Sequence, residues 1–134
     1  MQGSCLCGHI RYEVTRLASP IRHCSCRTCR KAHAAAFNTS SSARQADFRW
    51  LAGEGELKAY ESSPGKRRFF CGHCGTQLIA QRSGSDRVIL RMATLDDDPG
   101  QVPAGHIWAS HEVPWLAYGP QVPAYPQWDP STAE

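Results

Sequence analysis

Apolar and polar residues alternate along several short stretches of the chain, which is the period of a half-buried β-strand. The alternation is clearest over residues 9–15, and residues 87–92 form a more continuous apolar run that is typical of a buried strand. Further strands are predicted over residues 20–23, 37–43 (ending in a turn), 48–51, 57–61, 67–70 and 76–81. Residues 30–36 favour a turn of helix, because Lys and Ala are good helix formers. Many short strands with frequent turns predict an all-β fold.

The character of the chain changes after Gly100. Six of the nine prolines and three of the four tryptophans follow Val102. Proline lacks a backbone N–H and disfavours both helix interiors and central strands. We therefore expect one domain over residues 1–134, with a proline-rich C-terminal tail that wraps around it. The expected anchors of this tail are Ile107, Trp108, Trp115, Leu116 and Tyr118.

Three of the seven cysteines, Cys24, Cys26 and Cys29, lie within six residues. Thiolates this close repel one another unless a thiophilic metal binds them or they oxidise. Three sulfurs from one loop can occupy three corners of a zinc tetrahedron, and a fourth position left open is typical of reactive zinc sites. A labile metal loop is the alternative interpretation.

The other four cysteines form two pairs, Cys5-Leu6-Cys7 and Cys71-Gly72-His73-Cys74. Four thiols are the number that a closed all-thiolate zinc site needs. An odd total of seven argues against a pure disulfide framework. The cysteines therefore divide into a set of four and a set of three.

Charge and composition narrow the class of protein. The formal net charge is +3, but four thiolates on one zinc ion add about −2 and three on another add about −1, which brings the metal-loaded protein close to neutral. Arg27, Arg30 and Lys31 flank one cysteine group, and Arg67 and Arg68 precede the other, so we interpret them as charge compensation. Interleaved charge of this kind does not favour a nucleic-acid partner.

The chain shows neither a signal peptide nor an apolar run long enough for a membrane span. We therefore expect a cytoplasmic protein, whose thiols stay reduced and available to metal.

Three segments together resemble the glutathione-dependent formaldehyde-activating enzyme family: residues 3–8 (GSCLCG), 24–33 (CSCRTCRKAH) and 62–76 (SSPGKRRFFCGHCGT). The resemblance extends from Gly3 to about Tyr118. It implies a β-tent fold, in which a structural zinc joins two antiparallel sheets, and a second, catalytic zinc. It assigns Cys5, Cys7, Cys71 and Cys74 to the structural zinc, and Cys24, Cys26 and Cys29 to the catalytic one. Ala34 stands where the family commonly has glycine.

The activity that this resemblance implies is a zinc-dependent carbon–sulfur lyase reaction on a glutathione-type thiol adduct. In one direction glutathione and formaldehyde form S-(hydroxymethyl)glutathione. The candidate substrate-binding residues are Arg27, Arg30, Lys31 and His33. Alternatively, the two arginines and the lysine could interact with the metal-binding sulfurs and not with the substrate. The alternative is a non-catalytic zinc module that binds a protein partner or a small thiol. The expected partner is a small thiol rather than nucleic acid or membrane, and a homo-oligomer is compatible with the sequence.

Several polar residues have two interpretations. His23 and His33 are candidates to complete the second site or to move a proton, and they are also ordinary packing residues. His73, between two predicted ligands, is expected only to fill the cysteine turn. The run Asp96-Asp97-Asp98 superficially resembles a metal motif but is expected to form a solvated turn.

Overall fold

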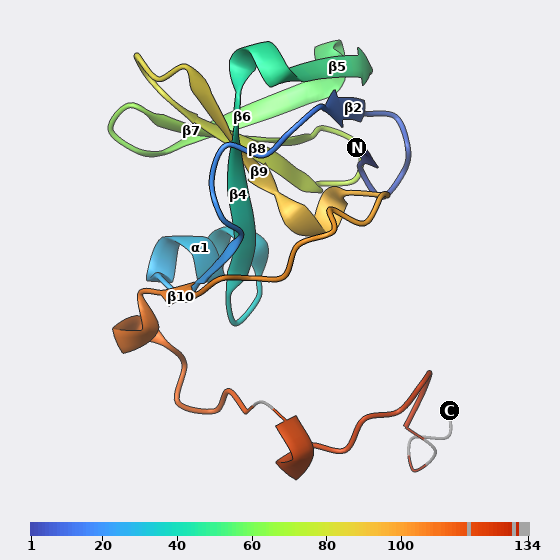
Figure 1. Cartoon of the computed structure of the whole chain (residues 1–134), viewed down its shortest axis with the longest axis vertical. Coiled ribbons are helices and arrows are strands. Elements are labelled where there is room, and N and C mark those ends of the chain that lie inside the picture. Colours follow the sequence, from blue (N-terminus) through green and yellow to red (C-terminus); the bar gives the residue numbers. More distant parts are fainter. Residues whose placement is uncertain (118, 130, 132–134) are drawn as a thin grey trace.

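The computed structural model describes residues 1–117, 119–129 and 131. Its strands form two sheets (Figure 1). The three-stranded sheet has the order β1 (Gln2–Ser4), β2 (Arg11–Val14) and β5 (Phe48–Ala52). The seven-stranded sheet has the order β10 (His106–Ile107), β3 (Arg22–Cys24), β4 (Asn38–Arg44), β9 (Arg87–Arg91), β8 (Gln77–Arg82), β7 (Lys66–Cys71) and β6 (Leu57–Ser63).

All eight predicted strands overlap an observed one, and β1 and β10 are the two that the pattern missed. These two strands contain only three and two residues, which is too short for a period-2 pattern to show. The large sheet is also mixed rather than antiparallel throughout, because β10 pairs with β3 in parallel. The fold is mostly β, with one short helix in the described residues.

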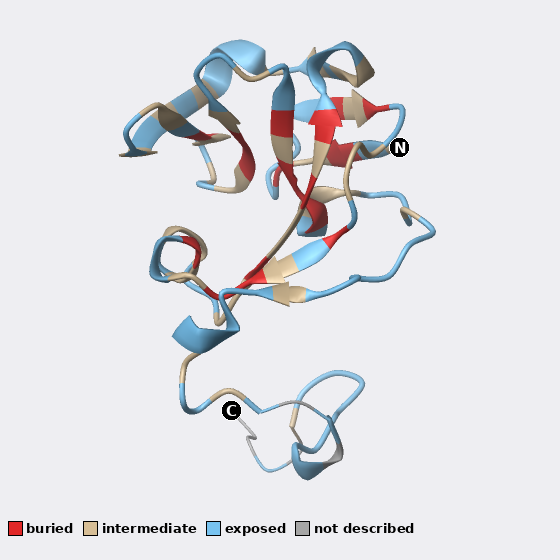
Figure 2. Cartoon of the chain, turned by 60° about the vertical axis from the view of Figure 1, so that its left-hand side comes forward, coloured by how far each residue is buried: buried red, intermediate tan, exposed pale blue. Residues whose placement is uncertain are grey.

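The core lies between the two sheets. Tyr12 and Val14 of the small sheet are completely buried, and they belong to one apolar cluster with Val88 and Leu90 of β9. Successive side chains of a strand point to opposite faces, so Arg91 is directed away from this core. Burying one such aliphatic side chain stabilises the fold by about 1.5–3 kcal/mol. Figure 2 shows the buried residues concentrated in the sheets rather than in the C-terminal segment.

Helix α1 (Arg27–His33) begins three residues before the predicted start. Cys26 takes the N-cap position, where its sulfur accepts a hydrogen bond from the Cys29 backbone N–H at 3.4 Å. A cysteine sulfur here replaces the usual Ser, Thr, Asp or Asn oxygen, which is why the pattern did not reveal the start. Cys29 consequently lies on the first helical turn rather than in a loop.

The expectation that the tail wraps the domain is wrong for most of its length. Residues 104–107 do run beside β3, since the Ala104 N–H donates to the Ile21 carbonyl and the Ser25 N–H donates to the Ile107 carbonyl. Beyond residue 111 the chain leads away from the sheets (Figure 1), and Trp115 and Trp128 are 71% and 87% exposed.

The anchors expected in this tail have different surroundings. Ile107 and Trp108 are 45% and 55% exposed, Leu116 is half-buried, and Tyr118 lies outside the described residues. The space between the sheets is already filled by the strands' own side chains, and prolines cannot donate to a sheet edge. No helix among the described residues is long and apolar enough to cross a membrane.

Candidate metal centres and their cleft

The four-cysteine cluster joins the two sheets. Cys5 and Cys7 lie between β1 and β2, whereas Cys71 ends β7 and Cys74 follows it in the turn before β8. Their sulfurs all lie within 4.8 Å of one another, and Cys7 Sγ is 3.5 Å from Cys5 Sγ and 3.8 Å from Cys71 Sγ. Tetrahedral bonds of about 2.3 Å, the zinc–sulfur length, would place sulfurs about 3.8 Å apart. The arrangement therefore fits a closed metal site.

Hydrogen bonds lower the pKa of two of these four thiols, and in Cys5 they do so against the opposing effect of burial. The Ile10 backbone N–H donates to Cys5 Sγ at 3.3 Å. The Thr76 hydroxyl lies 3.2 Å from Cys74 Sγ and accepts from the Leu6 backbone N–H at 3.1 Å. Its hydrogen bond is the main cause that lowers the pKa of Cys74 to about 5. Cys74 is thereby held as the thiolate, which is the form that binds metal.

Two histidines stack beside this cluster without joining it. The rings of His9 and His73 lie 4.5 Å apart, with His9 Nδ1 3.3 Å from Cys7 Sγ. His73 Nε2 pairs with the Glu56 carboxylate. Neither ring belongs to the set of mutually close ligand atoms, so both histidines flank the sulfurs.

The three-cysteine cluster forms where β3 meets α1. Cys24 ends β3, Cys26 caps the helix and Cys29 lies in its first turn, and their sulfurs are all within 4.8 Å of one another. Among the described residues, no His, Asp or Glu joins this group. The chain thus brings three ligands to this centre and four to the other, which is the difference between open and closed metal sites.

Burial and hydrogen bonding act in opposite directions on these thiols. Burial raises the pKa of Cys24 to about 12. Burial also acts to raise the pKa of Cys26, but hydrogen bonds from the Cys29 backbone N–H and from the neighbouring thiols outweigh it, so that this pKa is lowered. A buried guanidinium adds positive charge, since Arg68 Nη2 lies 3.8 Å from Cys29 Sγ. The surroundings therefore favour the thiolate of Cys26 before a metal binds, and metal binding requires all three sulfurs as thiolates.

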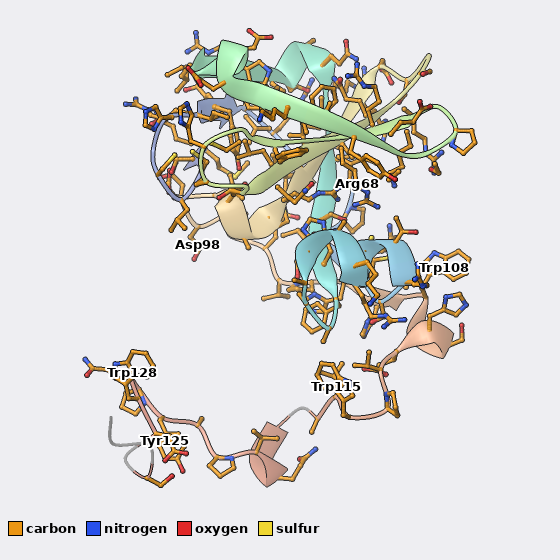
Figure 3. The ribbon with its side chains drawn as sticks, turned by 180° about the vertical axis from the view of Figure 1, so that it is seen from behind. Arg68, Asp98, Trp108, Trp115, Tyr125 and Trp128 are labelled. Carbon is orange, nitrogen blue, oxygen red and sulfur yellow. The ribbon has the colours of Figure 1, made fainter. Side chains whose placement is uncertain are left out.

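This cluster opens into a cleft of about 600 Å³ between α1 and the face of the large sheet opposite the core. Asn38, Ser40 and Ser42, alternate residues of β4, line its floor. Arg68 lies between the sheet and α1 (Figure 3). Among the described residues no Asp or Glu lines the cleft. Six basic side chains do: Arg22, Arg27, Lys66, Arg68, Arg82 and Arg91.

Comparison with known proteins identifies this architecture. The sequence model of the family described as glutathione-dependent formaldehyde-activating enzyme matches residues 1–111. The chain belongs to the glutathione-dependent formaldehyde-activating enzyme family. The resemblance inferred from the three cysteine-containing segments is thereby confirmed. The match ends where the chain leaves the sheets.

A solved structure has a similar fold. The crystal structure of a Rhodobacter sphaeroides protein from a structural genomics programme resembles this one with a TM-score of 0.63 and 28% sequence identity. The similarity covers 77% of this chain and 98% of that chain. A search of curated proteins returned no match.

The candidate substrate-binding residues of this family member occupy different places. Arg27 is exposed and lines the cleft. The Arg30 side chain instead donates from Nε to the Ser25 carbonyl at 3.0 Å, and Lys31 is exposed. His33 lines a separate pocket. Burial, then Arg91 and Arg68, lowers the pKa of His33 to about 4, so its ring is neutral near pH 7.

His23 does not join the three-cysteine cluster and packs against β4 and the residue before it. Its Nδ1 lies 2.8 Å from the Thr39 hydroxyl, and its ring contacts Phe37 at a centroid distance of 4.4 Å. A second histidine that the sequence did not single out, His106, lies with Nε2 2.6 Å from the hydroxyl of Ser25. Because Ser25 is fully buried between two of the cysteines, this contact orients the loop that carries them.

Sequence reasoning assigned Arg68 to the wrong cluster. It stands three residues before Cys71, yet its guanidinium contacts Cys29 of the other group. Alternation along β7 is the signal that separates them, because Lys66 and Arg68 share one face while Arg67 and Cys71 share the other. Arg91 was missed altogether, since it ends what was interpreted as a buried apolar strand.

The three consecutive aspartates, Asp96, Asp97 and Asp98, form hydrogen bonds within the chain. The Ser4 hydroxyl donates to Asp96 at 2.8 Å, and the Gln2 backbone N–H donates to Asp97 at 2.6 Å. Asp98 accepts from the Gly100 N–H at 2.8 Å and points away from the sheets (Figure 3). The first two aspartates therefore attach the edge strand β1 to the segment that follows β9.

Proposed function

We propose that this protein is a zinc-dependent carbon–sulfur lyase that acts on a glutathione-type thiol adduct. The observation that carries the proposal is the convergence of Cys24, Cys26 and Cys29 within 4.8 Å at a basic cleft. A purely structural site has no need of a three-ligand centre at an open cleft.

The two clusters would have different roles. Cys5, Cys7, Cys71 and Cys74 would hold a structural zinc that ties the sheets together. Cys24, Cys26 and Cys29 would hold the catalytic zinc, which when bound stabilises the thiolate form of a substrate thiol. Tetrahedral coordination by sulfur is typical of zinc, and the sulfur spacing of the first site fits it.

The reaction joins a thiol and an aldehyde. The thiol loses its proton, its sulfur forms a bond to the formaldehyde carbon, and the carbonyl electron pair moves to oxygen, which takes up a proton. The reverse reaction breaks the same carbon–sulfur bond. The cleft's basic residues supply what the chain itself contributes: Arg27 at the mouth attracts carboxylates of the thiol substrate, and the β4 hydroxyls and amide orient polar groups.

Magnetisation-transfer NMR tests the activity. Zinc-loaded protein should speed exchange between glutathione and S-(hydroxymethyl)glutathione in the presence of formaldehyde. The variant Cys26→Ser should lose this acceleration while its zinc content falls from two ions to one and its melting temperature is largely kept. Exchange at the uncatalysed rate with both zinc sites full would exclude the lyase. Glutathione binding under that condition would instead identify a non-catalytic thiol-binding module.

A further inference from the structure

Two arginines are buried in the wall of the cleft without an acidic partner. Arg68 and Arg91 are each only 3% exposed. Arg68 donates to the Ser62 hydroxyl at 2.9 Å and approaches Cys29 Sγ. In the part of the chain that the structure describes, Arg68 Nη1 and Arg91 Nε and Nη2 have no hydrogen-bond partner. Buried charges are normally paired, so this arrangement calls for an explanation.

Further positive charge lies beside these two guanidiniums. Lys66 is half-buried in the same cleft, and its pKa is lowered by burial and by its neighbours Arg68, Arg82 and Arg91. Burial and the nearby charge of Arg68 lower the pKa of Arg91 to about 10. The described residues that line the cleft include no carboxylate that would relieve this repulsion.

The simplest explanation is that the negative charge of the cysteine thiolates balances these basic residues. That charge is too small to do so. Three thiolates around one divalent metal retain a single negative charge. Arg68, whose Nη2 is 3.8 Å from Cys29 Sγ, already stands against that charge. Arg91 and Lys66 remain in surplus, together with the donor atoms that lack partners. An anion from outside the chain would satisfy both the charge and the hydrogen bonds.

We propose that Lys66, Arg68 and Arg91 form a subsite that binds a carboxylate of the thiol ligand whose sulfur reaches the metal. The subsite rests on the proposed function, because it concerns the same ligand. It differs from the exposed basic residues that the sequence suggested, since its members come from β7 and β9 rather than from the cysteine loop.

The position of the subsite restricts the ligand. Arg68 is within 3.8 Å of one cysteine sulfur, so a carboxylate bound there is close to the metal centre. Ser40, the register partner of Arg91 on β4, also lines the cleft and offers a hydroxyl to the same group. The ligand class is thus a thiol that carries a carboxylate able to reach the subsite while its sulfur lies at the metal, and neutral thiols are poor ligands.

Isothermal titration tests this with two matched thiols, 3-mercaptopropionate and its neutral amide, on the zinc-loaded protein. The carboxylate form should bind at least ten-fold more tightly to the unaltered protein. In Arg91→Met and in Lys66→Met that ratio should fall several-fold. Comparing ratios between variants removes the difference in acidity between the two thiols. Arg11→Gln, which removes an exposed charge on the small sheet, should retain the ratio of the unaltered protein.

The outcomes separate the two proposals. Equal binding of acid and amide to the unaltered protein would overturn the subsite and leave thiol binding at the metal intact. An unchanged ratio in both variants would also overturn it, and because Lys66 is only half-buried, its variant serves if Arg91→Met does not fold. If the neutral amide, the acid and glutathione itself all fail to bind the zinc-loaded protein, the proposed function fails and the subsite fails with it.

Discussion

Ala34 ends helix α1 in the left-handed conformation, with φ 47° and ψ 44°, and its N–H donates to the Arg30 carbonyl. Glycine adopts this conformation without strain, whereas the alanine methyl group crowds the backbone. A glycine at this position would therefore avoid the strain that the alanine side chain experiences. Ala34 follows the last of the three clustered cysteines, Cys29, by five residues.

Replacing this alanine should stabilise the protein. We expect Ala34→Gly to raise the free energy of unfolding by about 1 kcal/mol, because the left-handed strain is removed. The melting temperature should rise by about 3 °C in a chain of this size. Calorimetry on the zinc-loaded protein measures it, with Ala35→Gly as the control that should not stabilise. A lower melting temperature for Ala34→Gly would contradict the strain argument.

His33 should make stability depend on pH. Its pKa is lowered to about 4 in the folded state by burial and by two arginines, against about 6.5 unfolded. The unfolded chain therefore binds the proton first as pH falls, and stability is lost between about pH 6.5 and 4. Partial exposure reduces the effect to about 2 kcal/mol.

Urea titrations at several pH values measure this loss. His33→Gln should lose less stability than the unaltered protein between pH 7.5 and 5, and His111→Gln, at an exposed site, should follow the unaltered protein. Identical slopes for all three proteins would show that His33 is not held neutral.

At the scale of elements, the strands could be predicted because each has one buried face, which gives the sequence a period-2 alternation of apolar and polar residues. Residues 37–43 show the limit of that reasoning. Their serines suggested a strand that ends in a turn, whereas β4 runs on to Arg44 in the interior of the large sheet. Polar residues are tolerated there because Asn38, Ser40 and Ser42 face a polar cleft instead of the core.

Spacing alone predicted which cysteines group together, but it could not predict which residues surround each group. Four plus three is a matter of counting, and the two clusters match that division. Lys66, Arg68 and Arg91 line the cleft of the three-cysteine cluster because β7 and β9 lie in the same sheet as β3 and β4. This strand order brings together segments that are far apart in the sequence. No local pattern places Arg91 near Cys29, because they are far apart in sequence and meet through sheet order.

The two clusters should respond differently to mutation. Cys71→Ser removes a ligand from the cluster that joins the sheets, and zinc binding in such sites contributes roughly 10–16 kcal/mol, as much as a whole domain's stability. We expect unfolded or insoluble protein. Cys26→Ser should remain folded, since its cluster lies at a cleft beside one short helix. Circular dichroism with metal analysis distinguishes them. A folded Cys71→Ser that keeps full zinc in the other site would contradict the assignment.

At the scale of the whole molecule, the chain beyond residue 111 leads away from the sheets (Figure 1), so it adds little to their stability. The family match covers residues 1–111, and the described tail residues beyond it are mostly exposed. In the described part of this segment there is neither a long helix nor a central strand, as the proline content predicted. It could not reveal whether the tryptophans had a surface to pack against, since that depends on how completely the strands fill their own core.

Removing the tail should therefore leave the fold intact. A chain that ends at Glu112 keeps β10 and every residue of both clusters. We expect its melting temperature to lie within about 2 °C of the full chain, because little apolar surface is buried by the removed part. A loss of more than 10 °C would mean that the tail packs on the sheets after all.

The central claim is that one chain holds two zinc ions, one enclosed by four sulfurs and one bound by three that accepts a thiol. Anomalous diffraction at the zinc edge, on crystals grown with and without glutathione, tests it most directly. We expect two peaks, one within each cysteine cluster, and glutathione sulfur bonded to the metal at Cys24, Cys26 and Cys29. A single peak at the four-cysteine cluster, with glutathione elsewhere or absent, would contradict it.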